Sequence, residues 1–124
     1  MDRPRAWRSP AGRDDAPTWV PLELLCFHAQ QAAEKAIKAV ILHRTSEPAV
    51  FSHDLILLTD SAHEAGAPAP PLDAEAAQAL TQYAVLSRYP ADLGDVDEPE
   101  WQRSVADARA VVEWAAALVG SSPA

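Results

Sequence analysis

The apolar residues in residues 21–43 recur at intervals of three and four, as they do along one stripe of an α-helix. The stripe consists of Leu22, Cys26, Ala29, Ala33, Ala36 and Val40. By the same spacing, a polar group falls on the opposite side of this helix. That group consists of Gln31, Glu34, Lys35 and Lys38. We therefore expect one face to meet the protein core and the other to meet a second surface.

Three later segments repeat the helical spacing. The second helix is expected to begin after an N-cap at Ser52 and to end at Gly66. The third covers residues 74–87 and the fourth covers residues 97–119. No segment alternates apolar and polar residues in the way strands do. The pattern predicts an all-α, up-and-down four-helix bundle over residues 21–120.

Two aspartates are placed to cap the later helices. Asp73 directly precedes the third helix, and Asp97 stands three residues before Glu100, the spacing of a capping box. The N-terminal segment, residues 1–20, differs from the rest because it is rich in proline and arginine. Its prolines leave no room for a sustained helix, so we expect this segment to be loosely ordered.

The charge of the 124-residue chain is uneven. The formal net charge is −8, yet residues 1–13 hold four arginines against one aspartate, and the rest holds six basic against seventeen acidic side chains. An acidic body repels phosphate backbones, which argues against non-specific nucleic-acid binding. No apolar run approaches the roughly 20 residues of a membrane span, and no apolar signal core is present. We expect a cytoplasmic protein without a membrane partner.

Three segments carry a resemblance to a known family. They are Cys-Phe-His-Ala-Gln-Gln-Ala-Ala-Glu-Lys-Ala-Ile-Lys-Ala at 26–39, Ser-His-Asp-Leu at 52–55 and Leu-Ser-Arg-Tyr-Pro at 86–90. In this order they resemble the signature segments of the HEPN domain family, small all-helical domains. The comparable domains begin with an additional helix that packs antiparallel to the Gln-Gln-Ala-Ala-Glu-Lys helix. This chain has no convincing copy of it, and a Pro-rich segment stands in its place.

The resemblance implies a binding function. HEPN proteins of this type accompany minimal nucleotidyltransferases, often in toxin–antitoxin modules, and nucleotide binding has been proposed for them. On that basis Lys35, Lys38 and Arg88 could present cations to the phosphates of ATP or another nucleotide, and Tyr89 could stack on its base. No other cofactor is implied. None of the four histidines has the His-x-x-x-His spacing of a metal site, so we expect no metal.

A second interpretation is a metal-independent endoribonuclease toxin. The resemblance ties that activity to an arginine followed four to six residues later by a histidine. Arg88 is followed by no histidine, and the interval from Arg44 to His53 is too long. A catalytic pair would therefore need Arg88 and His53 to meet in space. The sequence argues against an enzyme on this ground and leaves the question open.

A third interpretation is structural. A polar network could hold the helices or two subunits together, with no ligand at all. Its predicted members are Gln31, Glu34, His53, Asp54 and Tyr83. Because the usual first helix is not evident, part of the apolar stripe would be uncovered, which favours a homodimer. The three interpretations share one fold and differ in what meets the polar face of the first helix.

Overall fold

Four helices make up the computed structural model, which describes residues 21–86 and 96–120. They are α1 (Leu22–Thr45), α2 (Leu55–Glu64), α3 (Ala74–Leu86) and α4 (Glu98–Gly120). No strand occurs in these two ranges. The predicted all-α bundle is confirmed. The Pro-rich N-terminal segment and the residues that follow α3, including Arg88 and Tyr89, lie outside the described ranges.

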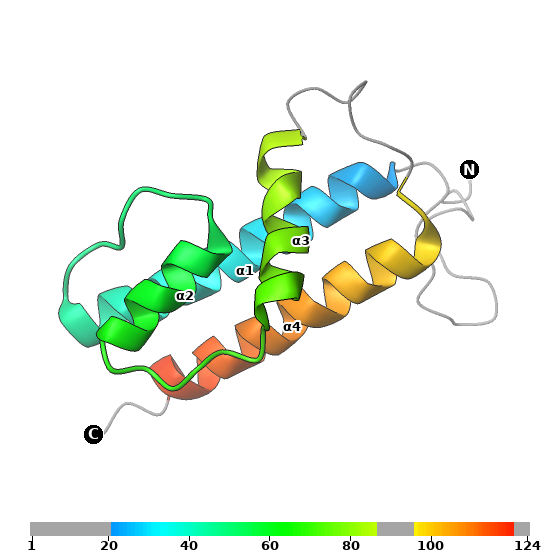
Figure 1. The fold of residues 1–124 in the computed structure, drawn as a ribbon. Helices are drawn as coiled ribbons and strands as arrows, with labels where there is room; N and C mark the ends of the chain where they lie inside the picture. Colours follow the sequence, from blue (N-terminus) through cyan, green and yellow to red (C-terminus); the bar gives the residue numbers. More distant parts are fainter. Residues whose placement is uncertain (1–20, 87–95, 121–124) are drawn as a thin grey trace, which may run out of the picture.

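The long helices α1 and α4 lie side by side and run in the same direction, and α3 crosses them (Figure 1). The short α2 packs on the C-terminal part of α1. All three other helices contact α1, which makes it the central helix of the fold. None of the four described helices is long and apolar enough to cross a bilayer.

The buried side of α1 is wider than its sequence predicts. Eight of its residues are buried: Cys26, Ala29, Gln30, Ala33, Glu34, Ile37, Val40 and Ile41. Four of these belong to the predicted stripe, whereas Ala36 is only partly buried and Ile37 is fully buried. Glu34, which the spacing places opposite the apolar stripe and against a second surface, is buried where α1 meets the loop that precedes α2. The buried side of α1 is wide because α2, α3 and α4 all contact this helix.

The predicted cap of α2 is also displaced. Asp54, not Ser52, is the N-cap, because its carboxylate accepts hydrogen bonds from the backbone N–H groups of Ile56 and Leu57. The Ser52 hydroxyl instead accepts from the Asp54 N–H at 3.0 Å, a local turn that leads into the helix. The Leu55 N–H donates to Thr81 Oγ1 of α3 at 3.0 Å, which fixes the start of α2 against α3.

The predicted caps of the last two helices are confirmed. Asp73 Oδ1 accepts from the Ala76 N–H at 2.8 Å, and Asp97 Oδ1 accepts from the Glu100 N–H at 2.9 Å. Each bond satisfies a backbone donor that has no partner within its own helix. After α2 the chain reverses at Gly66, whose φ of +90° favours glycine.

Candidate functional site

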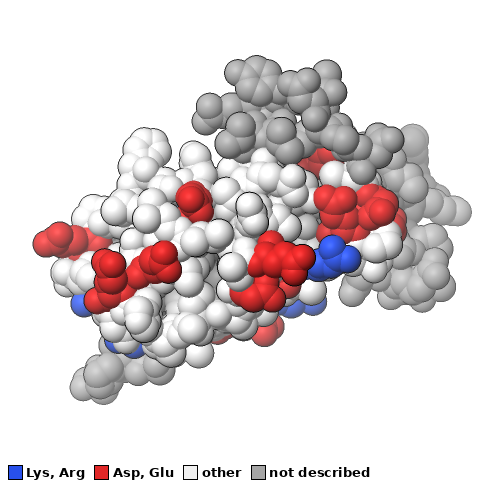
Figure 2. Space-filling model, viewed as in Figure 1, with Lys and Arg blue, Asp and Glu red and all other residues white. Residues whose placement is uncertain are grey.

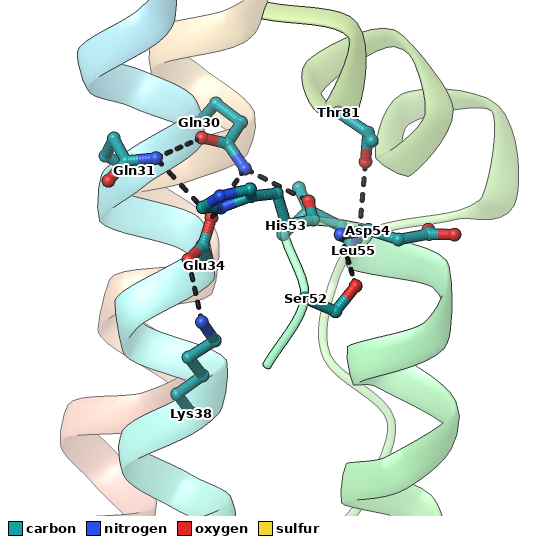
Figure 3. Close-up of polar contacts among 9 residues, drawn as sticks. All are labelled: Gln30, Gln31, Glu34, Lys38, Ser52, His53, Asp54, Leu55 and Thr81. Carbon is teal, nitrogen blue, oxygen red and sulfur yellow. Dashed lines mark hydrogen bonds and ion pairs between the residues drawn. The ribbon is translucent and has the colours of Figure 1, made fainter. Parts of the chain in front are cut away.

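A buried carboxylate lies where α1 meets the loop that precedes α2 (Figure 3). The Glu34 side chain is only 3% exposed. Its Oε1 lies 2.8 Å from His53 Nδ1 and accepts from Gln30 Nε2 at 2.9 Å, and its Oε2 accepts from Lys38 Nζ at 2.8 Å. Residues 30, 34 and 38 are four apart, so they share one face of α1. One carboxylate therefore holds an ammonium group and an imidazole ring in fixed positions.

The glutamine pair next to Glu34 ties the loop to α1. Gln30 Nε2 also donates to the backbone oxygen of His53 at 3.2 Å, and Gln31 Nε2 donates to Gln30 Oε1 at 2.7 Å. Gln30 is not among the site residues predicted from the sequence, although it is buried and central to this network. Its spacing gave a signal, because position 30 lies about 40° around the helix from buried position 26, at the edge of the apolar stripe.

Glu34 is ionised at neutral pH. Burial acts to raise its pKa, but hydrogen bonds from Lys38, His53 and Gln30 outweigh burial, so the pKa lies below its ordinary value of 4.5. An ionised carboxylate only accepts hydrogen bonds, which requires the proton of a neutral His53 ring to be on Nδ1. The other ring nitrogen, Nε2, is then left with a free lone pair.

The two partners of Glu34 reach the surface. The side chain of His53 is 40% exposed and that of Lys38 is 28% exposed, whereas the carboxylate beneath them is almost completely buried. Lys38 uses one of its three donors on Glu34. An ammonium group and an imidazole are thus oriented from below and remain accessible from outside. This cluster, which consists of Gln30, Gln31, Glu34, Lys38 and His53, is named the Glu34 cluster.

The structure brings together only some of the residues predicted for a site. Gln31, Glu34, Lys38 and His53 meet in the Glu34 cluster, whereas Asp54 caps α2 and faces that helix. Lys35 is exposed and forms no hydrogen bond or ion pair with any residue in the described ranges. Arg88 and Tyr89 lie outside those ranges, so their roles stay predictions.

Tyr83 does not belong to this network, which corrects the prediction. It is buried on the side of α3 that faces α4, and its hydroxyl donates to Glu100 of α4. Burial, followed by the hydrogen bond to Glu100, raises the pKa of Tyr83 well above its usual range, so the phenol stays protonated. The nearby Cys26 thiol is buried and its pKa is raised mainly by that burial. The Tyr83–Glu100 hydrogen bond joins α3 to α4 and has a structural role.

Two hollows lie away from the Glu34 cluster. A cleft of about 340 Å³ between α3 and α4 is lined by polar and acidic side chains, including Glu100 and Asp107. A wider groove of about 600 Å³ runs between α1 and α4. Most of its lining is apolar: Leu25, Ala29, Ala32, Trp101, Val105, Ala108 and Val112. Among the described helices, none covers this groove, which we name the α1–α4 groove.

The surface charge follows the acidic composition. Figure 2 shows aspartate and glutamate spread over the viewed face, with few lysines or arginines beside them. Within residues 21–86 and 96–120, no group of three or more His, Cys, Asp or Glu side chains is arranged to hold a metal ion. Within this acidic molecule, the Glu34 cluster pairs one lysine, Lys38, with one buried carboxylate.

Comparison with known proteins identifies the family. The family model of the HEPN domain matches residues 20–118. Neither the comparison with curated proteins nor the comparison with solved structures gives a match. The matched range covers all four helices up to the last turns of α4, and it includes the Glu34 cluster. The chain therefore belongs to the HEPN domain family.

Proposed function

We propose that this chain is a nucleotide-binding HEPN domain and that Lys38 and His53 receive the phosphate groups. One observation carries the proposal. The buried Glu34 carboxylate lies 2.8 Å from both Lys38 Nζ and His53 Nδ1, and both partners remain partly exposed. Donors that are already oriented lose less conformational freedom when a ligand binds. Such a pair is suited to oxygen atoms that carry negative charge.

The local charge supports a small ligand. When the His53 ring takes up a second proton, Nδ1 still donates to Glu34 and Nε2 becomes a donor that can meet a phosphate oxygen. In that state the positive charges of His53 and Lys38 exceed the single negative charge of Glu34, so the exposed surface of the cluster attracts phosphate. The acidic body around it repels a long polyanion, since repulsion from many phosphates accumulates along a strand. A mononucleotide presents its charge at one point and avoids most of this repulsion.

Calorimetric titration of ATP into the full-length protein tests the proposal. Lys38→Gln and His53→Gln should each weaken binding about tenfold or more, because each removes one charge-assisted hydrogen bond. Arg109→Gln is the matched control, since it removes an exposed positive charge from α4 at the α1–α4 groove, whose lining includes no residue of the Glu34 cluster. The absence of binding heat in the unmodified protein would contradict the proposal, as would equal losses in all three variants.

A second candidate function is ribonuclease activity, favoured by the orientation of His53. With its proton held on Nδ1 by Glu34, the ring offers Nε2 as a proton acceptor for a ribose 2′-hydroxyl. A cationic side chain would still be needed to stabilise the phosphorane, and Arg88 is the family-based candidate. Cleavage of single-stranded RNA that disappears in both His53→Ala and Arg88→Ala would establish this function.

The partners proposed for the chain are a second copy of itself and a minimal nucleotidyltransferase, as in toxin–antitoxin modules. Both rest on the family resemblance. The apolar α1–α4 groove supports the homodimer, because burial of such a surface stabilises association. Light scattering on the purified chain measures the oligomeric state directly.

A further inference from the structure

We propose that Phe51 is a stacking platform for a nucleobase beside the phosphate site, so that the ligand is a mononucleotide and not a simple phosphate. This inference rests on the proposed function and names the part of the ligand that meets the loop before α2. Phe51 lies two residues from His53, the exposed imidazole of the Glu34 cluster. No residue of this loop was predicted from the sequence to contact a base.

The exposure of Phe51 is unusual for its type. It is 92% exposed, whereas every other exposed large hydrophobic side chain in the described ranges is 50% exposed or less. A phenylalanine stabilises a fold by leaving water, and this one remains almost entirely in water. Because the core does not use Phe51, the fold gives no reason for an aromatic ring at this position. Binding a flat ligand does give one.

The ring orientation leaves a face free for such a ligand. The centroids of the Phe51 and His53 rings are 6.3 Å apart, and the ring planes meet at 81°. This edge-type contact, a favourable arrangement of aromatic rings, does not cover Phe51 by parallel stacking. With the high exposure of the ring, it leaves at least one aromatic face open to a base.

The distance between the two groups suits a nucleotide. In a nucleotide the base and the first phosphate are separated by one sugar, a span comparable with the 6.3 Å between the rings. A nucleotide whose base stacks on Phe51 would therefore extend its phosphates toward His53. Lys38 lies next along this path, because Glu34 holds both His53 and Lys38. Stacking does not read hydrogen-bonding groups on the base, so all bases should bind, with purines favoured by their larger area.

The test compares ATP with inorganic tripolyphosphate, which has a similar charge but no base. In titrations of the full-length protein, ATP should bind about five to a hundred times more tightly than tripolyphosphate. Phe51→Ala should lower the affinity for ATP to that for tripolyphosphate and leave the affinity for tripolyphosphate unchanged. Phe51→Trp should retain the affinity for ATP. Leu57→Ala, which shortens another exposed apolar side chain nearby, is the control and should change neither affinity.

The outcomes separate this inference from the proposed function. If ATP and tripolyphosphate bind equally well, or if Phe51→Ala leaves ATP binding unchanged, the stacking role is overturned while the phosphate site stands. Phe51 would then be free to serve as an anchor for a protein partner. If Phe51→Ala weakens both ligands equally, the stacking role is also overturned, because the loss does not depend on the base. If neither ligand binds the unmodified protein, the proposed function fails as well.

Discussion

Replacing Glu34 with alanine should lower the free energy of unfolding by about 2–4 kcal/mol. The variant removes the acceptor shared by Gln30, His53 and Lys38, and it leaves a cavity beside buried Gln30. The loss should be smaller than for a fully enclosed ion pair, because Lys38 and His53 can turn toward water. Urea unfolding followed by circular dichroism measures it.

Lys38→Ala is the control for this prediction. This variant removes the more exposed partner of the same ion pair and leaves Glu34 bonded to His53 and Gln30. It should therefore lower the free energy of unfolding by about 1 kcal/mol or less. A Glu34→Ala protein that is as stable as the Lys38→Ala protein would contradict the view that the buried carboxylate organises this junction.

The contribution of Glu34 should also depend on pH. Its pKa is lower in the folded protein than its ordinary value of 4.5, so the unfolded chain binds a proton more readily than the folded one. The stabilisation is therefore complete above about pH 4.5 and is lost as the pH falls through the lower folded value. In acid, the stability difference between the unmodified protein and Glu34→Gln should shrink.

Replacing Ile37 with alanine should cost about 2–5 kcal/mol of unfolding free energy. Ile37 is fully buried near the middle of α1, the helix that contacts all the others. Truncating it opens a cavity that the surrounding helices can fill only in part. Chemical unfolding measures the change.

Val112→Ala is the matched control for Ile37, because Val112 lies on α4 and is 41% exposed, whereas Ile37 is fully buried. Its truncation should cost less than about 1 kcal/mol. Comparable losses for the two variants would mean that the core is not centred on α1 in the way described.

The helices and most of their caps followed from the sequence because they depend on local chemistry. Spacing of three and four locates a helix, and an aspartate before a helix can satisfy its free N–H groups, as Asp73 and Asp97 do. The N-cap of α2 shows the limit of this reasoning, because Ser52 was predicted and Asp54 is observed. Both side chains can cap a helix, and only the path of the loop decides which one meets the first turn.

The site was harder to predict because it depends on which helix packs where. Spacing places Glu34 among the polar residues of α1, but it cannot reveal that α2 and its loop cover that position. For the same reason Ile37 was left out of the predicted core, and Tyr83 was placed near Glu34 when it faces Glu100. The sequence placed Glu34 and His53 in one predicted polar network, but spacing alone could not show that these residues, nineteen apart, are in direct contact.

Glu34 Oε1 lies 2.8 Å from His53 Nδ1, so we expect a neutral His53 ring to carry its proton on Nδ1 and to leave Nε2 toward the outside. Nitrogen-15 NMR of the neutral histidine rings tests this most directly. We expect a protonated Nδ1 and an unprotonated Nε2 for His53, and a loss of this preference in Glu34→Gln. A His53 ring protonated on Nε2 in the unmodified protein would contradict the account.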